Sequence, residues 1–254
     1  MTTCVPRTLL IAHGPRSIGQ SPRLALTFDD GPHPVHTPRL LDCLHHYGLR
    51  ATFYVIGANA QKYPELIRRM AAAGHEVANH TYTHSEPRQT SASVFLNEVR
   101  TTDNLLKELV GTTTTTMRPP KGELSWSKCR GLWQQQKAIA LWNVDAKDYR
   151  MQSADEMLHW CNKYQPRDGD ILLFHDNHPY ATVAVEHLAA KGIFQKFETS
   201  TVAAWIPSSS AHRTRAHEEN SRSSTRISSP QSSHYEQGKS ITVPQNSVDV
   251  KAGV

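Results

Sequence analysis

The chain has 254 residues, of which 38% are hydrophobic, and it carries a formal net charge of +5 at pH 7. The positive charge is mild and scattered, so it does not form the basic stripe interleaved with aromatic side chains that is typical of nucleic-acid binding. No apolar run approaches the roughly 20 residues of a transmembrane helix. We therefore expect neither a nucleic-acid partner nor a membrane span.

Four cysteines lie far apart and include no Cys-x-x-Cys pair, which argues against a zinc ribbon, a redox site or a disulfide framework. Near the N-terminus, the apolar run 9–12 is shorter than the roughly 7 to 15 residues of a signal-peptide core. As written, the sequence predicts a cytoplasmic protein. A different translation start would instead allow an extracellular or envelope location.

Composition divides the chain into three regions. Residues 207–254 are rich in Ser, Arg, Gln and His and show no apolar periodicity, so we predict a disordered Ser-rich tail. Residues 1–20 are predicted to form an N-terminal extension. Residues 21–206 remain as the catalytic domain, which is long enough for one well-packed α/β fold. We expect this protein to be a monomer.

Within that domain, apolar strand-like segments alternate with segments of helical periodicity. The expected strands are 24–28, 50–56, 76–79, 112–116, 138–144, 170–174 and 194–197. The expected helices are 37–47, 64–74, 91–110, 127–137, 153–163 and 182–190. This alternation predicts an α/β fold with parallel strands joined by right-handed crossovers. About seven parallel strands predict an incomplete (β/α) barrel with its site in an open groove, which suits a polymer better than a small metabolite.

Two stretches carry a pattern of metal ligands. The first expected strand runs directly into Asp29 and Asp30, and the third is followed by His80 and His84. A His-x-x-x-His spacing brings both rings to one side of a turn, and one carboxylate completes a ligand set that suits Zn²⁺. We predict Asp30, His80 and His84 as metal ligands and Asp29 as the base that takes a proton from the activated water. The alternatives are an acidic turn and hydrogen-bonded loop histidines.

Further polar residues lie at other strand ends. Arg118, held by the prolines that follow it, is expected to pair with Asp29 and keep it ionised. The backbone N–H of Lys121 is placed to help stabilise an oxyanion. His175 is expected to donate a proton to the leaving group, with Asp145 orienting it and raising its pKa. A surface arginine before a Pro-Pro turn and a structural histidine at a strand end are the alternatives.

Taken in order, these motifs resemble those of a known family. The motifs are Thr27-Phe-Asp-Asp-Gly-Pro32, His80-Thr-Tyr-Thr-His84, Arg118-Pro-Pro-Lys-Gly122, Asp145-Ala-Lys-Asp-Tyr149 and Leu173-Phe-His175. The series resembles the five motifs of the polysaccharide deacetylases, carbohydrate esterase family four, over about residues 20 to 206. The resemblance implies a distorted (β/α) barrel.

The resemblance also implies roles for the matching residues. They are the roles given above for Asp29, the three metal ligands, Arg118, His175 and Asp145, and Leu173 is added as part of the acetate pocket. Two positions depart from the family pattern. Lys121 stands where an aromatic residue is more frequent, which is expected to place a positive charge near the metal. Tyr149 stands where tryptophan is commoner, which predicts a smaller and more polar acetate pocket.

The function predicted from the sequence is that of a metal-dependent hydrolase. It would remove N-acetyl groups from N-acetylglucosamine-containing glycans, either chitin-like or peptidoglycan-like oligomers. The expected cofactor is a divalent ion, Zn²⁺ or alternatively Co²⁺, and the expected partner is the acetylated glycan substrate. The alternatives are an O-acetyl esterase on xylan or another acetylated glycan, and a non-catalytic carbohydrate-binding relative.

Overall fold

The structure, a computed structural model, describes residues 10–112 and 115–206. The predicted tail, 207–254, lies outside the described residues. The strands are β1 (Leu10–Ile11), β2 (Arg23–Asp29), β3 (Ala51–Val55), β4 (Glu76–Asn79), β5 (Thr116–Met117), β6 (Ala138–Ala140), β7 (Val144–Asp145), β8 (Asp170–His175) and β9 (Glu198–Thr199).

The helices begin and end mostly where local sequence signals place them. They are α1 (His36–His46), α2 (Gly57–Lys62), α3 (Pro64–Ala72), α4 (Ala92–Val110), α5 (Trp126–Gln134), α6 (Ala154–Lys163), α7 (Tyr180–Ala190) and α8 (Ile193–Lys196). Short 3₁₀ turns are η1 (Pro120–Gly122), η2 (Asp148–Arg150) and η3 (Ala203–Trp205). Ser91, Ser125 and Ser153 each accept a backbone N–H at the start of α4, α5 and α6, as N-cap residues do.

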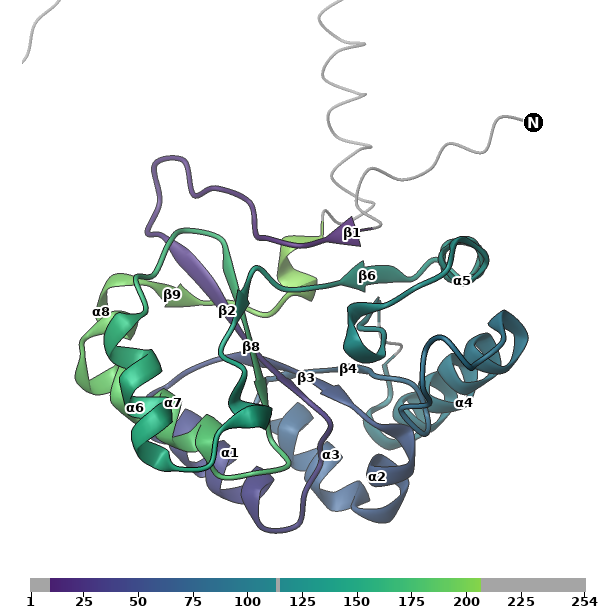
Figure 1. The fold of residues 1–254 in the computed structure, drawn as a ribbon, viewed down its shortest axis with the longest axis horizontal. Coiled ribbons are helices and arrows are strands. Elements are labelled where there is room, and N and C mark those ends of the chain that lie inside the picture. Colours follow the sequence, from purple (N-terminus) through teal and green to yellow (C-terminus); the bar gives the residue numbers. More distant parts are fainter. Residues whose placement is uncertain (1–9, 113–114, 207–254) are drawn as a thin grey trace, which may run out of the picture. The chain divides into compact units, whose positions relative to one another are not determined.

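All strand pairs of the described sheet are parallel, in the order β1-β6-β5-β4-β3-β2-β8-β7, with β9 added beside the first residues of β2. The sheet curls into a partial barrel (Figure 1). The predicted incomplete (β/α) barrel is therefore confirmed. Because the strands are parallel, their carboxyl ends meet at one rim, where sites of such folds are built.

Residues 141–143 join two strands at opposite ends of this order, β6 and β7. A connection of three residues spans at most about 15 Å, so the curl brings the two sheet edges close together. Leu141 N–H donates to the carbonyl of Ile11 beside one edge, and Asn143 Nδ2 donates to Asp170 beside the other. The single strand predicted over 138–144 is thus wrong, because the chain leaves one edge of the sheet and joins the other.

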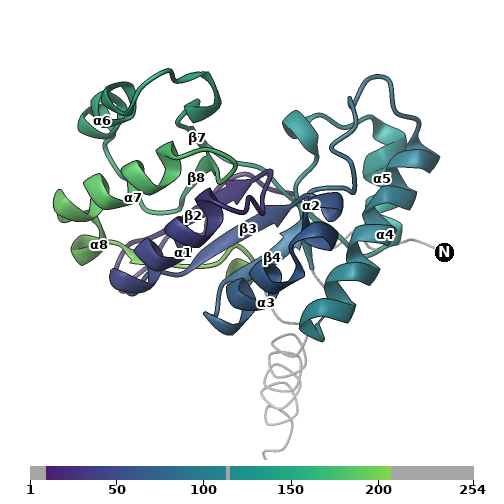
Figure 2. The same ribbon diagram turned by 90° about the horizontal axis from the view of Figure 1, so that it is seen from below.

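The helices pack around the outside of the curled sheet in the order α6, α7, α1, α3, α4, α5, each in contact with the next. Figure 2 shows α1, α3 and α7 along one side of β2, β3 and β8. On β2, Leu24, Leu26 and Phe28 belong to the core that packs under these helices. Because side chains alternate along a strand, Thr27 and Asp29 share the opposite, inner face.

The inner face has its own small core. It contains Ala25 of β2, Tyr54 of β3 and Ile171 of β8, and it is closed by Val202 and Trp205 near η3. The last described segment therefore fills the interior of the partial barrel. Apolar packing there leaves the polar inner residues only at the rim.

Two further expectations differ from the structure. The predicted strand 194–197 is instead helix α8, which begins after Gly192 in the left-handed conformation and buries Ile193 against the core. Within the predicted N-terminal extension, β1 pairs with β6, so residues 10 and 11 belong to the sheet. A strand of two residues carries too short a pattern to be recognised in sequence.

Candidate active site

The candidate residues gather at the carboxyl rim because adjacent parallel strands deliver them there. Asp29, the last residue of β2, is in register with His175, the last residue of β8. Strands β4 and β5 pair at their last residues, so His80 and Arg118, which follow them, are neighbours. Residues far apart in sequence thus meet at a single place.

Asp29 and Arg118 form a buried ion pair, as expected from the sequence. Arg118 Nη1 donates to Asp29 Oδ1 at 2.7 Å, and the arginine side chain is fully buried. Its other N–H groups donate to Thr27 Oγ1 at 2.8 Å and to the carbonyls of Ala140 and Leu141 at 3.2 and 2.9 Å. Because Arg118 is satisfied on every side, it fixes the orientation of Asp29 and leaves Oδ2 unengaged by the guanidinium.

Asp30, His80 and His84 converge beside this pair. Asp30 Oδ1 lies 3.5 Å from Nε2 of His80 and 3.5 Å from Nε2 of His84. One ligand atom from each residue lies within 4.8 Å of the others. Asp30 and His84 both have positive φ angles, 73° and 56°, which side chains other than glycine rarely adopt. Strained backbone of this kind is concentrated at functional sites.

The donor atoms in this cluster fit a cation. His80 Nδ1 lies 2.7 Å from the carbonyl oxygen of Arg118, which can only accept, so Nδ1 carries the proton. In the neutral ring, Nε2 then directs a lone pair towards Asp30 Oδ1, a buried oxygen with no hydrogen-bond partner among the described residues. One carboxylate oxygen and two imidazole nitrogens are a set that Zn²⁺ prefers, with positions left open. These residues can hold such an ion.

The protonation of the cluster is set by its mutual charges. Burial alone would raise the pKa of Asp30, but the hydrogen bond and charge of His80 lower it to about 2. Burial alone would lower the pKa of His80, but the carboxylates of Asp29 and Asp30 raise it. Burial and the charge of His80 lower the pKa of His84. Asp30 is therefore ionised, and His84 neutral, at the pH where a metal would bind.

His175 is held by Asp148 rather than by Asp145. His175 Nδ1 donates to Asp148 Oδ1 at 2.7 Å, and the His175 backbone N–H donates to Asp148 Oδ2 at 2.7 Å. The expectation for Asp145 is wrong because its Oδ1 accepts the N–H of Lys147, after which the chain turns through a left-handed residue. The 3₁₀ turn η2 then carries Asp148, fully buried, beneath His175.

This contact controls the charge of His175. Burial would lower the pKa of the imidazole, but the hydrogen bond and charge of Asp148, followed by the charges of Asp29 and Asp30, raise it to about 9. At neutral pH the ring therefore carries both protons. With Nδ1–H donated to Asp148, the Nε2–H is the proton that can be given away.

A pocket of about 420 Å³ opens over these groups. Its walls also include Lys121, Trp142, Asp145, Tyr149, Arg150 and Leu173. The Tyr149 ring packs edge-on against His175, with 5.3 Å between centroids. Lys121 Nζ pairs with Glu86 at 2.5 Å, so the positive charge expected near the metal is compensated at the pocket wall.

Three residues of this site were not predicted from sequence. Trp142 was hidden inside the segment read as one strand, and Arg150 follows the last motif residue that attracted attention. Asp148 was visible as a second carboxylate in the same motif as Asp145, so only the choice between the two failed. Spacing along a turn does not show which of two nearby acids points inward.

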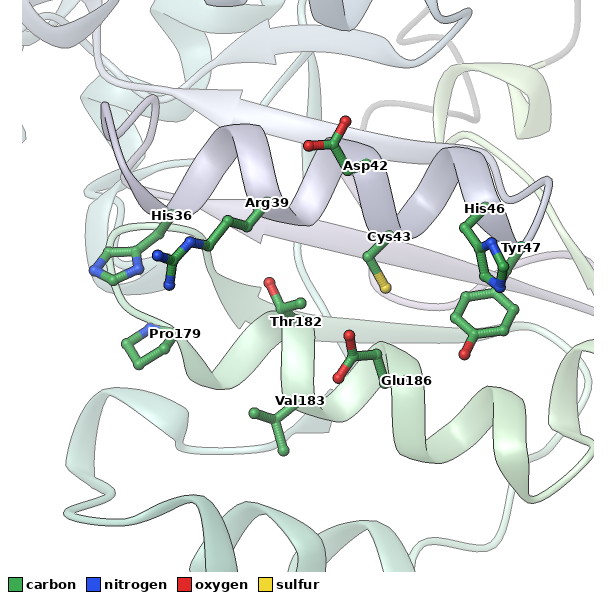
Figure 3. A pocket seen from close by; sticks show the side chains of 10 residues that line it. All are labelled: His36, Arg39, Asp42, Cys43, His46, Tyr47, Pro179, Thr182, Val183 and Glu186. Carbon is green, nitrogen blue, oxygen red and sulfur yellow. The ribbon is translucent and has the colours of Figure 1, made fainter.

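A larger hollow of about 640 Å³ lies between α1 and α7 (Figure 3). Arg39, Asp42 and Cys43 of α1 face Glu186 of α7 across it. Burial and the charge of Glu186 raise the pKa of the Cys43 thiol to about 12, so it is not a nucleophile at neutral pH. This hollow lies away from the strand ends and brings no catalytic set together.

Comparison with known proteins agrees with the geometry at the rim. The family model described as "Polysaccharide deacetylase" matches residues 17–137. A chitooligosaccharide deacetylase of Sinorhizobium fredii is 37% identical over 171 residues, which cover 65% of this chain and 77% of that protein. The chain belongs to the polysaccharide deacetylase family. It is thus related to hydrolases whose named members are deacetylases.

Two other family members show the extent of the likeness. A peptidoglycan-N-acetylglucosamine deacetylase of Bacillus cereus is 37% identical over 132 residues, covering 52% of this chain and 48% of that protein. The chain thus spans about half the length of this relative. The structure of peptidoglycan deacetylase PdaC from Bacillus subtilis matches 80% of this chain and 98% of that one, with 30% identity and a TM-score of 0.68.

Among the described residues, no helix has both the length and the apolar character needed to cross a bilayer.

Proposed function

We propose that this family member is a metal-dependent hydrolase that removes N-acetyl groups from N-acetylglucosamine-containing glycans. One observation carries the proposal. The buried Asp29–Arg118 pair lies beside the cluster of Asp30, His80 and His84, and protonated His175 stands next to Asp29 on the adjacent strand. A base, a metal-binding set and an acid therefore surround one pocket, as amide hydrolysis requires.

Asp29 is the base in this mechanism. Arg118 holds Oδ1, so Oδ2 is the oxygen that takes a proton from the attacking water. Asp30, His80 and His84 would hold a divalent ion, which supplies Lewis acidity towards the carbonyl and acidifies water. The N–H of Lys121, at the pocket wall, is proposed to donate to the developing oxyanion.

His175 is the acid. As the carbon–nitrogen bond breaks, its Nε2–H is given to the leaving nitrogen, so the sugar departs as an amine and acetate remains. Asp148 stabilises the imidazolium before transfer and holds the ring in place. Leu173 and Tyr149 are proposed to border the acetyl methyl group, since both line the pocket next to His175.

The substrate class is proposed from the relatives as well as from the pocket. Relatives named for chitooligosaccharide and for peptidoglycan deacetylation match this chain at the same level of identity, 37%. Both glycans present N-acetylglucosamine, so we propose an oligomer containing this sugar. We propose zinc as the ion because the ligand set holds one oxygen and two nitrogens.

The test is acetate release from N-acetylglucosamine oligomers by chelator-stripped protein, before and after one equivalent of Zn²⁺. We expect release only with zinc, and we expect Asp29→Asn to lose at least about 100-fold in rate, since general-base catalysis contributes 10²–10⁴-fold. Asp155→Asn, which changes an exposed acid in the first turn of α6, is the matched control and should keep its rate.

Zinc content is measured on each variant, so that loss of the ion is distinguished from loss of the base. Full activity in metal-loaded Asp29→Asn would exclude the base assignment. Release from acetylated xylan but not from the amide substrates would favour the esterase reading instead.

A further inference from the structure

A second set of metal-ligand side chains lies on the far side of His175. Asp148, His175 and His178 each offer one ligand atom, and these atoms lie within 4.8 Å of one another. His175 Nδ1 is 2.7 Å from Asp148 Oδ1, and His178 Nε2 is 3.7 Å from Asp148 Oδ2. The set faces Nδ1 of His175, whereas the catalytic proton is on Nε2.

His178 has no partner that explains its position. Both of its ring nitrogens are buried and lack a hydrogen-bond partner among the described residues. Burying a polar group without a partner costs about 1–3 kcal/mol, so such groups in native structures call for a ligand. Its side chain is 21% exposed, and that of His175 is 13% exposed, so a hydrated ion can approach the set.

The carboxylate at the centre of this set is fixed in advance. Asp148 is fully buried in η2, and its two oxygens accept the backbone N–H groups of Tyr149 and His175. His178 comes from the loop between β8 and α7, which begins directly after His175. Two neighbouring elements thus present one carboxylate oxygen and two imidazole nitrogens, the same donor set as Asp30, His80 and His84.

We propose that Asp148, His175 and His178 bind a second divalent ion of the zinc class, and that this ion inhibits the enzyme. The ion takes the place of the proton that joins His175 Nδ1 to Asp148, and that proton leaves to solvent. A metal-bound imidazole has only its Nε2–H left, which is a far weaker acid than an imidazolium. His175 then no longer supplies a proton to the leaving group.

The two sites differ in what they have to give up. Asp30 Oδ1 has no hydrogen-bond partner before an ion arrives, whereas Asp148 already holds His175. The second site is therefore the weaker one, and zinc should activate at low concentration and inhibit at higher concentration. The inhibition rests on the proposed role of His175 as the acid, but the binding of the second ion does not.

The experiment counts zinc ions and measures acetate release in parallel. Untagged, chelator-stripped protein is dialysed against a series of free Zn²⁺ concentrations, and bound zinc is measured by mass spectrometry. The variants are His178→Gln and His178→Phe at the second site and His84→Gln at the first. His187→Gln on α7 is the matched control, because His187 Nε2 contacts only a surface amide, Asn162 Oδ1 at 2.8 Å, among the described residues.

We expect two binding steps of one ion each in the wild type and in His187→Gln. In both His178 variants, the weaker step should move to at least about tenfold higher zinc, and inhibition, taken relative to each variant's own maximal rate, should move with it. His84→Gln should weaken the tighter step only.

A wild type that binds a single ion across the inhibitory range would overturn the proposal, as would unchanged inhibition in both folded His178 variants. Two binding steps without acetate release by any protein would support the second ion site and would count against the proposed deacetylase.

Discussion

A single buried carboxylate sets the behaviour of the candidate acid. Asp148 contacts His175 through the ring and through the backbone, whereas Asp145 only lines the pocket. The pKa of His175, raised from 6.5 to about 9, means that the folded protein binds this proton more tightly than the unfolded chain. The resulting stability is fully present below pH 6.5 and is lost as the pH rises towards 9.

Replacing this carboxylate should change the pH dependence of turnover. In Asp148→Asn the pKa of His175 is expected to fall back towards its ordinary value, so the alkaline limb of kcat/KM should move down by about two pH units. The protonated fraction at pH 8, and with it the rate, should then fall on the order of 30-fold, since each unit is tenfold. The measurement is kcat/KM between pH 5 and 10.

Asp145→Asn is the matched comparison. It removes a carboxylate three residues away on the same motif, and it should leave the alkaline limb within a few tenths of a unit. A bound cation lowers both limbs together, so the difference between the two variants is the quantity to compare. Equal shifts in both variants would return the orienting role to Asp145.

Residue identity could be predicted from the sequence where the chemistry has few choices. Adjacent carboxylates, a His-x-x-x-His pair and an arginine before two prolines all lie at the ends of parallel strands, so they meet at one rim. The choice between Asp145 and Asp148 depends on one left-handed residue, Lys147, which turns the chain. A lysine gives no sequence sign of such a conformation, whereas glycine would.

At the scale of elements, long periodic segments were predictable and short ones were not. Strand 76–79 is confirmed with the same bounds, and the helix predicted over 91–110 differs from α4 by one residue at its start. The segment 138–144 is apolar and β-branched enough to be one strand, and only closure of the barrel divides it into β6 and β7. That division depends on contacts with β1 and β8, which no local pattern reports.

The last described turn, η3, contributes to the core of the domain from inside the barrel. Trp205 is 8% exposed and packs with Ala25, Ile171 and Val202 on the inner face. Gly14 lies so close to it that a Cβ there would be 2.6 Å from the ring. The inner face therefore has no replacement for this side chain if it is removed.

Trp205→Ala should lower the free energy of unfolding by about 3–5 kcal/mol, because truncating a buried aromatic residue loses burial and leaves a cavity. Urea unfolding followed by circular dichroism provides the measurement. Trp126→Ala, which removes a tryptophan that is 73% exposed, is the matched control and should change stability by no more than about 0.5 kcal/mol. A loss below about 1 kcal/mol in Trp205→Ala would mean that η3 does not support the barrel.

For the molecule as a whole, the fold concentrates negative charge at one rim. Asp29 is balanced by Arg118 and Asp148 by His175, but Asp30 Oδ1 has no partner among the described residues. Close behind it, burial and the charge of Asp30 raise the pKa of Asp176 to about 7. An arrangement of this kind is costly without a cation, and the strained backbone of Asp30 and His84 adds to that cost.

Binding of one divalent ion should therefore stabilise the folded protein. At a free Zn²⁺ concentration 100 times the Kd of the tighter site, linkage predicts a gain of about 2.7 kcal/mol, or roughly 5–10 °C in Tm for a domain of this size. Calorimetry of chelator-treated and zinc-loaded protein measures the shift. His84→Gln should lose most of it, whereas His45→Gln, an exposed histidine on α1, should keep it. An equal shift in His84→Gln would place the stabilising ion elsewhere on the chain, and the base and acid at the rim would then lack the ion that the proposed hydrolysis requires.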